Sequence, residues 1–122
     1  MEFWDLYDKD FNKINKIVKR GEKLNVDEFH IVVNAWIKND KGEFLITQRS
    51  ANKSFPLMWE CTGGSALQGE SPLKATIREV KEELGIDVYE EKSIFFVKNS
   101  SVSSRNLVNS SLLSLSLFNL SA

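Results

Sequence analysis

Residues 64–86, with the sequence GSALQGESPLKATIREVKEELGI, constrain the fold most because they mark both ends of a single helix. Ser71 is a favourable N-cap residue, and Pro72 suits the first helical position, where its missing N–H leaves no bond unmade. Gly85 provides a C-terminal stop. The sequence therefore predicts a helix from Pro72 to about Leu84 that is entered from a glycine-containing loop.

The two sides of this helix differ in chemistry. On a helical wheel its apolar side chains fall within about 60° of one another; they are Leu73, Ile77, Val80 and Leu84. Glu79, Glu82 and Glu83 occupy an arc of about 100° on the opposite side, with Arg78 at its edge. Carboxylates at this spacing repel by roughly a few tenths of a kcal/mol per pair. A hard divalent cation bound between them would explain their convergence, and a solvated acidic face is the alternative.

Strand-like segments lie on both sides of the helix. They are expected at residues 3–7, 14–18, 30–38, 43–49, 58–62 and 93–98. The first two alternate around a polar stretch and predict a β-hairpin over about 3–19. The turn signal NDKG at 39–42 is expected to join the third and fourth segments as a second hairpin. Strands mixed with one central helix indicate an α/β or α+β sandwich.

Length and charge exclude several classes of protein. A chain of 122 residues forms one domain, and a net charge of −1 lacks the basic excess of a nucleic-acid-binding surface. No apolar run is long enough to predict a membrane span. Cys61 is the sole cysteine, so an internal disulfide is excluded, and the first residues lack a secretory pattern. We therefore expect a cytoplasmic protein.

The composition changes after residue 98. Residues 99–122 contain nine serines and one charged residue, Arg105, and no acidic residue follows Glu91. We expect a domain over 1–98, with its core from about residue 30, followed by an atypical tail over 99–122. Leucines and serines alternate in part between 112 and 121, which is a weak strand pattern, but a disordered terminus is the favoured interpretation. A tail foreign to the domain is a third interpretation.

Nine residues around the helix have fixed spacing. They follow G-x5-E-x7-R-E-U-x-E-E-x-G-U, where U is a bulky aliphatic residue; they are Gly64, Glu70, Arg78, Glu79, Val80, Glu82, Glu83, Gly85 and Ile86. At average residue usage, a chance match in this chain has a probability on the order of 10⁻⁷. The pattern resembles the signature of the Nudix hydrolase family, and the general layout of that family extends over about residues 30–97.

The resemblance implies an α/β/α sandwich with a mixed β-sheet, in which the motif forms a catalytic loop–helix–loop. Members of the family typically hydrolyse a nucleoside diphosphate linked to another moiety, using Mg²⁺ or Mn²⁺. Carried over by position, Glu79, Glu82 and Glu83 would bind the metal. One of the three, Glu79 or Glu83, would act as the base that activates water instead of binding the metal. Gly64 would let the backbone approach the metal and offer its carbonyl oxygen.

The same resemblance assigns supporting roles to the remaining motif residues. Arg78 would orient Glu79 and pair with Glu70, which would brace the loop against the helix. Gly85 and Ile86 would end the helix and return the chain to the core. The implied partner is a small diphosphate substrate, without nucleic acid or membrane, and relatives are often homodimers.

Residues outside the motif permit two interpretations each. Arg49 would bind a substrate phosphate, as arginines at this point do in similar proteins, or it is a surface arginine. Phe55 and Trp59 would form a stacking surface for a base, whereas a tryptophan beside a strand is more often part of the core. His30 is expected at a strand edge or in the core. Cys61 is expected to be a small buried apolar residue.

Two other functions stay open at this point. Family members often carry a later acidic residue and a C-terminal helix, which the sequence after residue 98 does not suggest, so a weakly active or inactive Nudix-like module is one alternative. The chain also resembles type I isopentenyl diphosphate isomerases, and residues 4–8 and 19–21 are similar to the hairpin of hydrolases close to them. Those isomerases use a cysteine and a metal held largely by histidines, but this chain has one histidine. Its Thr62-Gly63-Gly64 sequence follows the hydrolases.

Overall fold

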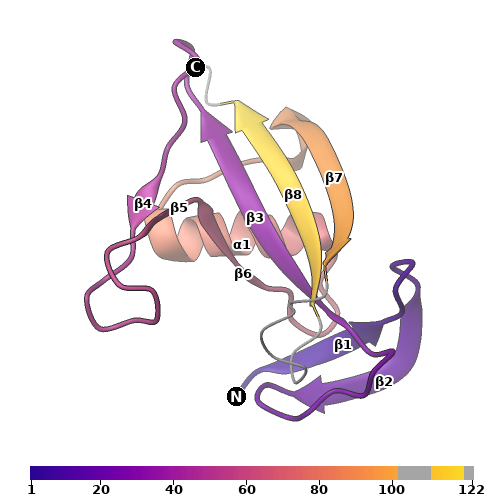
Figure 1. The fold of residues 1–122 in the computed structure, drawn as a ribbon. Helices are drawn as coiled ribbons and strands as arrows, with labels where there is room; N and C mark the ends of the chain where they lie inside the picture. The colour runs from indigo at the N-terminus through magenta and orange to yellow at the C-terminus, as the bar shows by residue number, and fades with distance from the viewer. Residues whose placement is uncertain (102–110, 120–122) are drawn as a thin grey trace.

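The computed structural model describes residues 1–101 and 111–119. Their elements are β1 (Phe3–Tyr7), β2 (Lys13–Lys19), β3 (His30–Lys38), β4 (Thr47–Gln48), β5 (Trp59–Glu60), β6 (Thr62–Ser65), α1 (Pro72–Leu84), the 3₁₀ turn η1 (Glu90–Lys92), β7 (Ser93–Ser101) and β8 (Ser111–Asn119). A mixed sheet has the strand order β6-β3-β8-β7, and the pairs β1-β2 and β4-β5 form two smaller sheets. In Figure 1, α1 crosses behind this sheet and the β1-β2 hairpin lies at one end. The expected α/β class, with a mixed sheet and a loop–helix–loop, is confirmed.

The helix α1 has the predicted bounds, Pro72–Leu84. The Ser71 hydroxyl accepts a hydrogen bond of 3.2 Å from the Lys74 N–H, which caps the first turn. Gly85 adopts a left-handed conformation with φ of 69°, and its N–H donates to the Lys81 carbonyl at 3.0 Å. Glycine takes up this conformation without a side-chain clash, so the helix ends there.

The inner face of the mixed sheet packs against α1. Alternate residues of β3 are buried, as the two-residue period of a strand requires: Ile31, Val33, Ala35 and Ile37. Val80 of α1 is fully buried in a cluster with Ala35, Ile37 and Val88. The other predicted apolar positions of α1 pack against that cluster; they are Leu73, Ile77 and Leu84. The expected apolar stripe of the helix is therefore confirmed.

The β1-β2 hairpin confirms the prediction for residues 3–19. It has its own apolar cluster, made by Trp4, Leu6, Val18 and Leu24. Backbone hydrogen bonds attach it to the rest of the molecule: Tyr7 and Phe29 exchange two, of 2.8 and 2.9 Å, and the Gln68 N–H donates to the Phe3 carbonyl at 2.8 Å. The last bond reaches the loop before α1, so the hairpin contacts the region of the motif.

The second expected hairpin forms only at its turn. The Asn39 side chain accepts a hydrogen bond of 2.9 Å from the Glu43 N–H, which closes the predicted turn. Pairing with β3 is then limited to an isolated bridge between Lys38 and Phe44 and a backbone hydrogen bond of 2.8 Å from the Leu45 N–H to the Ile37 carbonyl. The returning chain leaves β3 and pairs as β4 with β5. The prediction of a strand over 43–49 is therefore wrong except at Thr47–Gln48, because β5 competes as the pairing partner.

The segment expected as one strand over 58–62 is divided at Cys61. Residues before Cys61 form β5 and pair with β4, whereas residues after it form β6 and pair antiparallel with β3. The chain therefore changes partner at Cys61, immediately before the two glycines of the motif.

Residues 111–119 lie in the centre of the mixed sheet rather than in a disordered tail. Strand β8 pairs in parallel with β3 from His30↔Ser111 to Lys38↔Asn119, and antiparallel with β7 on its other side. The weak leucine–serine alternation thus marks a strand, as its period of two permits. The proposed boundary at residue 98 falls inside β7, and residues 102–110 and 120–122 lie outside the described part of the chain.

Among residues 1–101 and 111–119, no helix combines the length and the apolar character needed to cross a lipid bilayer.

Candidate active site

The acidic side of α1 faces strand β6 at its two glycines. A Cβ atom added to Gly64 would collide with the Glu79 carboxylate, so these two residues are in close contact. The Glu79 side chain is only 14% exposed. The neighbouring Gly63 N–H donates a hydrogen bond to the Glu83 carboxylate. Glu79 and Glu83 are therefore held under β6, whereas Glu82 is 60% exposed and alone fits a solvated acidic face.

Arg78 joins α1 to the loop that precedes it. Its Nε and Nη2 donate to the two carboxylate oxygens of Glu70 at 2.7 and 2.9 Å, and Nη2 also donates to the Ser65 carbonyl at 3.1 Å. Burial opposes the charge of Glu70, but the hydrogen bonds from Arg78 and Leu67 outweigh it and lower the pKa of Glu70. The same pairing raises the pKa of Arg78. The structure thus places Arg78 and Glu70 as the resemblance implied.

The guanidinium of Arg78 also donates hydrogen bonds to two of the three carboxylates of α1. Its Nη1 donates to Glu79 Oε1 at 2.9 Å and to Glu82 Oε2 at 3.2 Å. Arg78 therefore orients Glu79, which is the arrangement expected for that pair. It also draws both carboxylates toward the loop side of the helix.

Glu83 has a different electrostatic environment. Burial has the largest effect on the Glu83 carboxyl and raises its pKa. The negative charges of Glu79 and Glu60 raise the pKa further, whereas the positive charge of Lys53 lowers it. These causes show that Glu60 of β5 belongs to the same acidic group as Glu79 and Glu83. Sequence reasoning missed Glu60, because only its place shortly before the motif glycines sets it apart from other exposed glutamates.

Arg49 lies at the edge of this group. Its Nη1 donates to Glu60 Oε2 at 2.8 Å, and its Nε donates to the Ser54 carbonyl at 2.7 Å. Arg49 thus holds the β4-β5 loop in place and also reaches the acidic residues. Phe55 of that loop and Trp59 of β5 are exposed, so the expectation of a core position for Trp59 is wrong. The side chain of Trp59 instead stands at the surface beside Glu60.

The carboxylates offer oxygen donors but not a closed metal cage. Within residues 1–101 and 111–119, no three carboxylate, histidine or cysteine side chains stand close enough together to hold an ion as they are. Arg78 donates hydrogen bonds to Glu79 and Glu82 and so occupies one oxygen of each. An all-oxygen set of Glu79, Glu83 and the Gly64 backbone suits a hard cation such as Mg²⁺ or Mn²⁺. The donor chemistry therefore fits the implied metal, provided that the cation replaces Arg78 as the partner of Glu79.

Asp5 supports the motif loop from the hairpin. Its carboxylate accepts a hydrogen bond of 2.7 Å from the Gly69 N–H, one residue before Glu70. Lys13 lies 3.3 Å away and balances the charge of this buried side chain. No pattern in the sequence singled out Asp5, because its partner is 64 residues away along the chain.

The two remaining candidates lie apart from the acidic group. His30 is buried and stacks on Trp4 with ring centroids 4.0 Å apart, which confirms its expected place in the core. Burial, with a smaller effect of Arg20, lowers the pKa of His30 from 6.5 to about 4. Cys61 is half-buried, and burial raises the pKa of its thiol.

The sequence model of the NUDIX domain matches residues 28–108, which is more than half of the chain. The chain belongs to the Nudix family. Ile86 and Gly85 follow the acidic helix as the motif requires, and Ile86 packs against the core cluster of α1 and β3.

Two curated proteins illustrate its relationships. The chain is 44% identical over 90 residues to an uncharacterized Nudix hydrolase, lin0387, of Listeria innocua. The aligned residues cover 72% of this chain and 53% of that protein. It is 34% identical over 68 residues to the isopentenyl-diphosphate Δ-isomerase of Escherichia coli O127:H6, covering 54% of this chain and 37% of that enzyme. The chain thus spans about half the length, or less, of these relatives.

Solved structures confirm the Nudix fold. The structure of DR0079 from Deinococcus radiodurans has a TM-score of 0.69 and 25% identity, and the match covers 99% of this chain and 74% of that one. A bifunctional NMN adenylyltransferase/ADP ribose pyrophosphatase from Francisella tularensis, complexed with AMP and a manganese ion, has a TM-score of 0.62 and 21% identity, covering 82% and 28%.

Proposed function

We propose that this Nudix chain is a hydrolase that depends on Mg²⁺ or Mn²⁺ and cleaves a diphosphate linkage in a nucleoside diphosphate derivative or a related organic diphosphate. The observation that carries the proposal is the contact of Glu79 and Glu83 with Gly63-Gly64 of β6, beside the Arg78–Glu70 pair. Family membership and the manganese ion in one structural neighbour support it. A cytoplasmic location and a homodimer stay predictions.

Each residue has a proposed role in this reaction. Glu79, Glu82 and Glu83, with the Gly64 carbonyl, would hold the cation. When bound, the cation neutralises the charge of the diphosphate and lowers the pKa of an attacking water. Glu79 or Glu83 accepts the proton of that water, since a carboxylate within hydrogen-bonding reach can act as a general base.

Two arginines have separate proposed tasks. The bidentate bond between Arg78 and Glu70 keeps the loop and α1 at a fixed separation, so that the Gly64 carbonyl stays near the carboxylates. Arg49 would bind a substrate phosphate at the edge of the acidic group. Arg49 pairs with Glu60 through Nη1, and we expect a phosphate to bind the remaining N–H groups of its guanidinium.

The test is hydrolysis of a panel of nucleoside and alkyl diphosphate derivatives with Mg²⁺, measured as phosphate release after coupling to a phosphatase. We expect Glu83→Gln to abolish turnover, whereas Glu22→Gln, at an exposed glutamate of the β2-β3 connection, leaves it unchanged. If no compound is hydrolysed while circular dichroism shows an intact fold, the chain is an inactive Nudix module and the proposal fails.

An isomerase is the second candidate, because the chain is 34% identical over 68 residues to the Escherichia coli isomerase. The structure offers little for its chemistry. The sole histidine, His30, is buried against Trp4 and cannot supply the histidine set that the resemblance to those isomerases implied. Double-bond migration in isopentenyl diphosphate that is lost in Cys61→Ala would establish the isomerase instead.

A further inference from the structure

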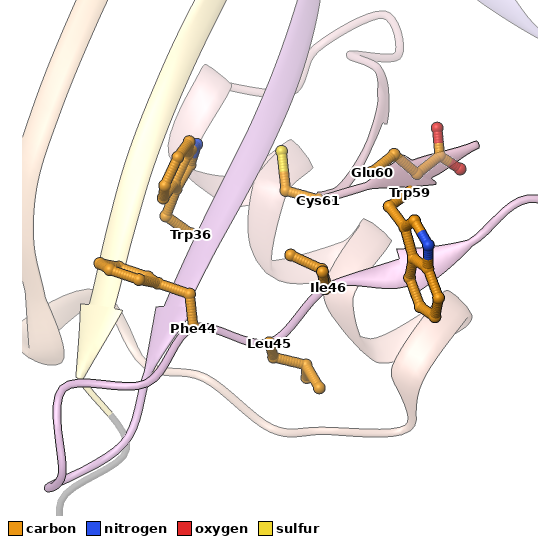
Figure 2. Close-up of a pocket in the computed structure, with 7 residues that line it drawn as sticks. All are labelled: Trp36, Phe44, Leu45, Ile46, Trp59, Glu60 and Cys61. Carbon is orange, nitrogen blue, oxygen red and sulfur yellow. The ribbon is translucent and has the colours of Figure 1, made fainter.

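A pocket of about 170 Å³ opens between β3 and the β4-β5 segment. Its walls are Trp36, Phe44, Leu45, Ile46, Trp59, Glu60 and Cys61. In Figure 2, Trp36 and Phe44 stand on one side, Trp59 and Glu60 stand on the other, and Ile46 and Cys61 lie between them. The pocket lies where the chain leaves β3 after Leu45, within the segment 43–49 that was predicted as a continuous strand.

The wall is apolar and open to solvent. The five large apolar side chains of the pocket are between 40% and 63% exposed. Trp36 and Phe44 contact edge to face, with ring centroids 5.2 Å apart and an angle of 83° between the rings, so this part of the wall is ordered. Contiguous exposed apolar surface around a hollow is typical of a binding site rather than of ordinary protein surface.

Glu60 connects this pocket with the acidic side of α1. Glu60 and Cys61 line the pocket, and Gly64, three residues after Cys61, is in close contact with the Glu79 carboxylate. Arg49 holds the Glu60 carboxylate from the β4-β5 loop at 2.8 Å. A ligand whose phosphates lie at Arg49 and at a cation held by the carboxylates of α1 would therefore reach the pocket with the group next to its phosphates.

We propose that the pocket binds the hydrocarbon part of an organic diphosphate whose phosphates lie on the acidic side of α1. This substrate class rests on the proposed function and narrows it. Glu60 is the charged group in the wall, and Arg49 already pairs with it. A nucleobase would bury polar groups that lose their hydrogen bonds to water in this mostly apolar wall, which is unfavourable. An alkyl group has no such hydrogen bonds to lose.

The volume of the pocket favours the same class. Sites that enclose a whole drug-sized ligand measure roughly 300–1,000 Å³. At about 170 Å³, this pocket encloses only part of such a ligand, and a chain of a few carbons fits it. Burial of one CH₂ group strengthens binding about fourfold, so the preference is measurable as a dependence on chain length.

The experiment uses non-hydrolysable methylene-bisphosphonate analogues of methyl to pentyl diphosphate, in the presence of Mg²⁺. Binding is followed as protection of Cys61, the sole cysteine, from N-ethylmaleimide, because Cys61 lies in the pocket wall. We expect about fourfold tighter binding for each added carbon until the pocket is full. Ile46→Ser should abolish this gradient, and Leu45→Ser should weaken it. Met58→Ser, at an exposed apolar residue outside the pocket, is the matched control and keeps the gradient.

The outcomes separate the pocket from the reaction. Equal protection by all chain lengths overturns the proposal, even if diphosphates are hydrolysed. A gradient in Cys61 protection without hydrolysis of any diphosphate supports the pocket and contradicts the proposed function. Tighter binding of a nucleoside bisphosphonate than of the pentyl analogue, weakened by Ile46→Ser, overturns the hydrocarbon class.

Discussion

The Asp5 carboxylate accepts a hydrogen bond of 2.7 Å from the Gly69 N–H and thereby ties strand β1 to the loop before α1. That loop carries Glu70, the partner of Arg78. The N-terminal hairpin therefore contacts the loop of the Nudix motif, although it lies outside the residues that the family model matches.

Asp5→Ala should destabilise the protein because it removes the buried carboxylate that accepts from the Gly69 N–H and pairs with Lys13. A hydrogen bond to a buried charged group contributes about 2 kcal/mol. We expect the free energy of unfolding in urea to fall by about that amount, with a loss of hydrolytic rate as the loop loosens. Asp10→Ala, at an exposed turn residue, is the control. Equal stability of the two variants would show that the Asp5–Gly69 bond does not brace the loop.

Gly64→Ala and Gly63→Ala should separate catalysis from stability. A Cβ at Gly64 meets the end of the Glu79 side chain, which can move aside, so the fold survives but the metal ligand is displaced. A Cβ at Gly63 meets the Val33 backbone carbonyl, which cannot move without opening the β3-β6 pairing. We expect Gly64→Ala to reduce the hydrolytic rate about 100-fold with little change in thermal midpoint. Gly63→Ala should lower the midpoint. The reverse pattern would place Glu79 outside the reaction.

Stability should fall with decreasing pH because of His30. Its folded-state pKa is about 4, against 6.5 for an unperturbed histidine, so the unfolded chain gains a proton first as the pH falls below 6.5. The contribution of His30 is complete above that pH and declines toward pH 4 by about 3 kcal/mol in total.

Urea unfolding from pH 7 to pH 4.5 tests the role of His30 against His30→Phe, which keeps an aromatic ring on Trp4 without a titrating group. The wild type should lose more stability than the variant over this interval. Curves that run parallel would mean that His30 is protonated in the folded protein.

Ser114→Pro should disrupt the fold because Ser114 lies in a strand that is paired on both sides, opposite Val33 and Lys98. Proline removes a backbone donor, and it is found in sheets essentially only at edges or bulges. We expect a loss of about 3 kcal/mol or more in unfolding free energy. Ser114→Ala keeps the amide and is the control. A stable Ser114→Pro protein would contradict a central position for β8.

Local signals predicted the helix and its motif to the residue. Ser71, Pro72 and Gly85 act within one turn of the helix ends, and the apolar spacing of α1 depends only on the helical period. The Arg78–Glu70 pair was also expected, because the resemblance to the Nudix signature implies it. Sequence alone thus indicated the family, the fold class and the acidic residues.

Pairing between distant segments accounts for the predictions that were wrong and for the residues that were missed. The strand expected over 43–49 is short because β5 competes with β3 for the returning chain. The pattern of β8 is weak, and only its ladder with β3 and β7 shows that it is a central strand. Glu60 and Asp5 join the site through partners that are remote in sequence, so no local pattern identifies them.

The ladder between β3 and β8 has a kinetic consequence. It begins with His30 opposite Ser111, which are 111 − 30 = 81 residues apart. A loop of that length must close before the first of these backbone bonds forms, and the entropy lost in closure precedes any gain. Proteins dominated by such distant pairings cross their folding barrier in milliseconds to seconds rather than microseconds. Until that closure, one side of β3 offers unpaired amides to other nascent chains, so the concentration of newly made protein decides how much of it reaches the native state.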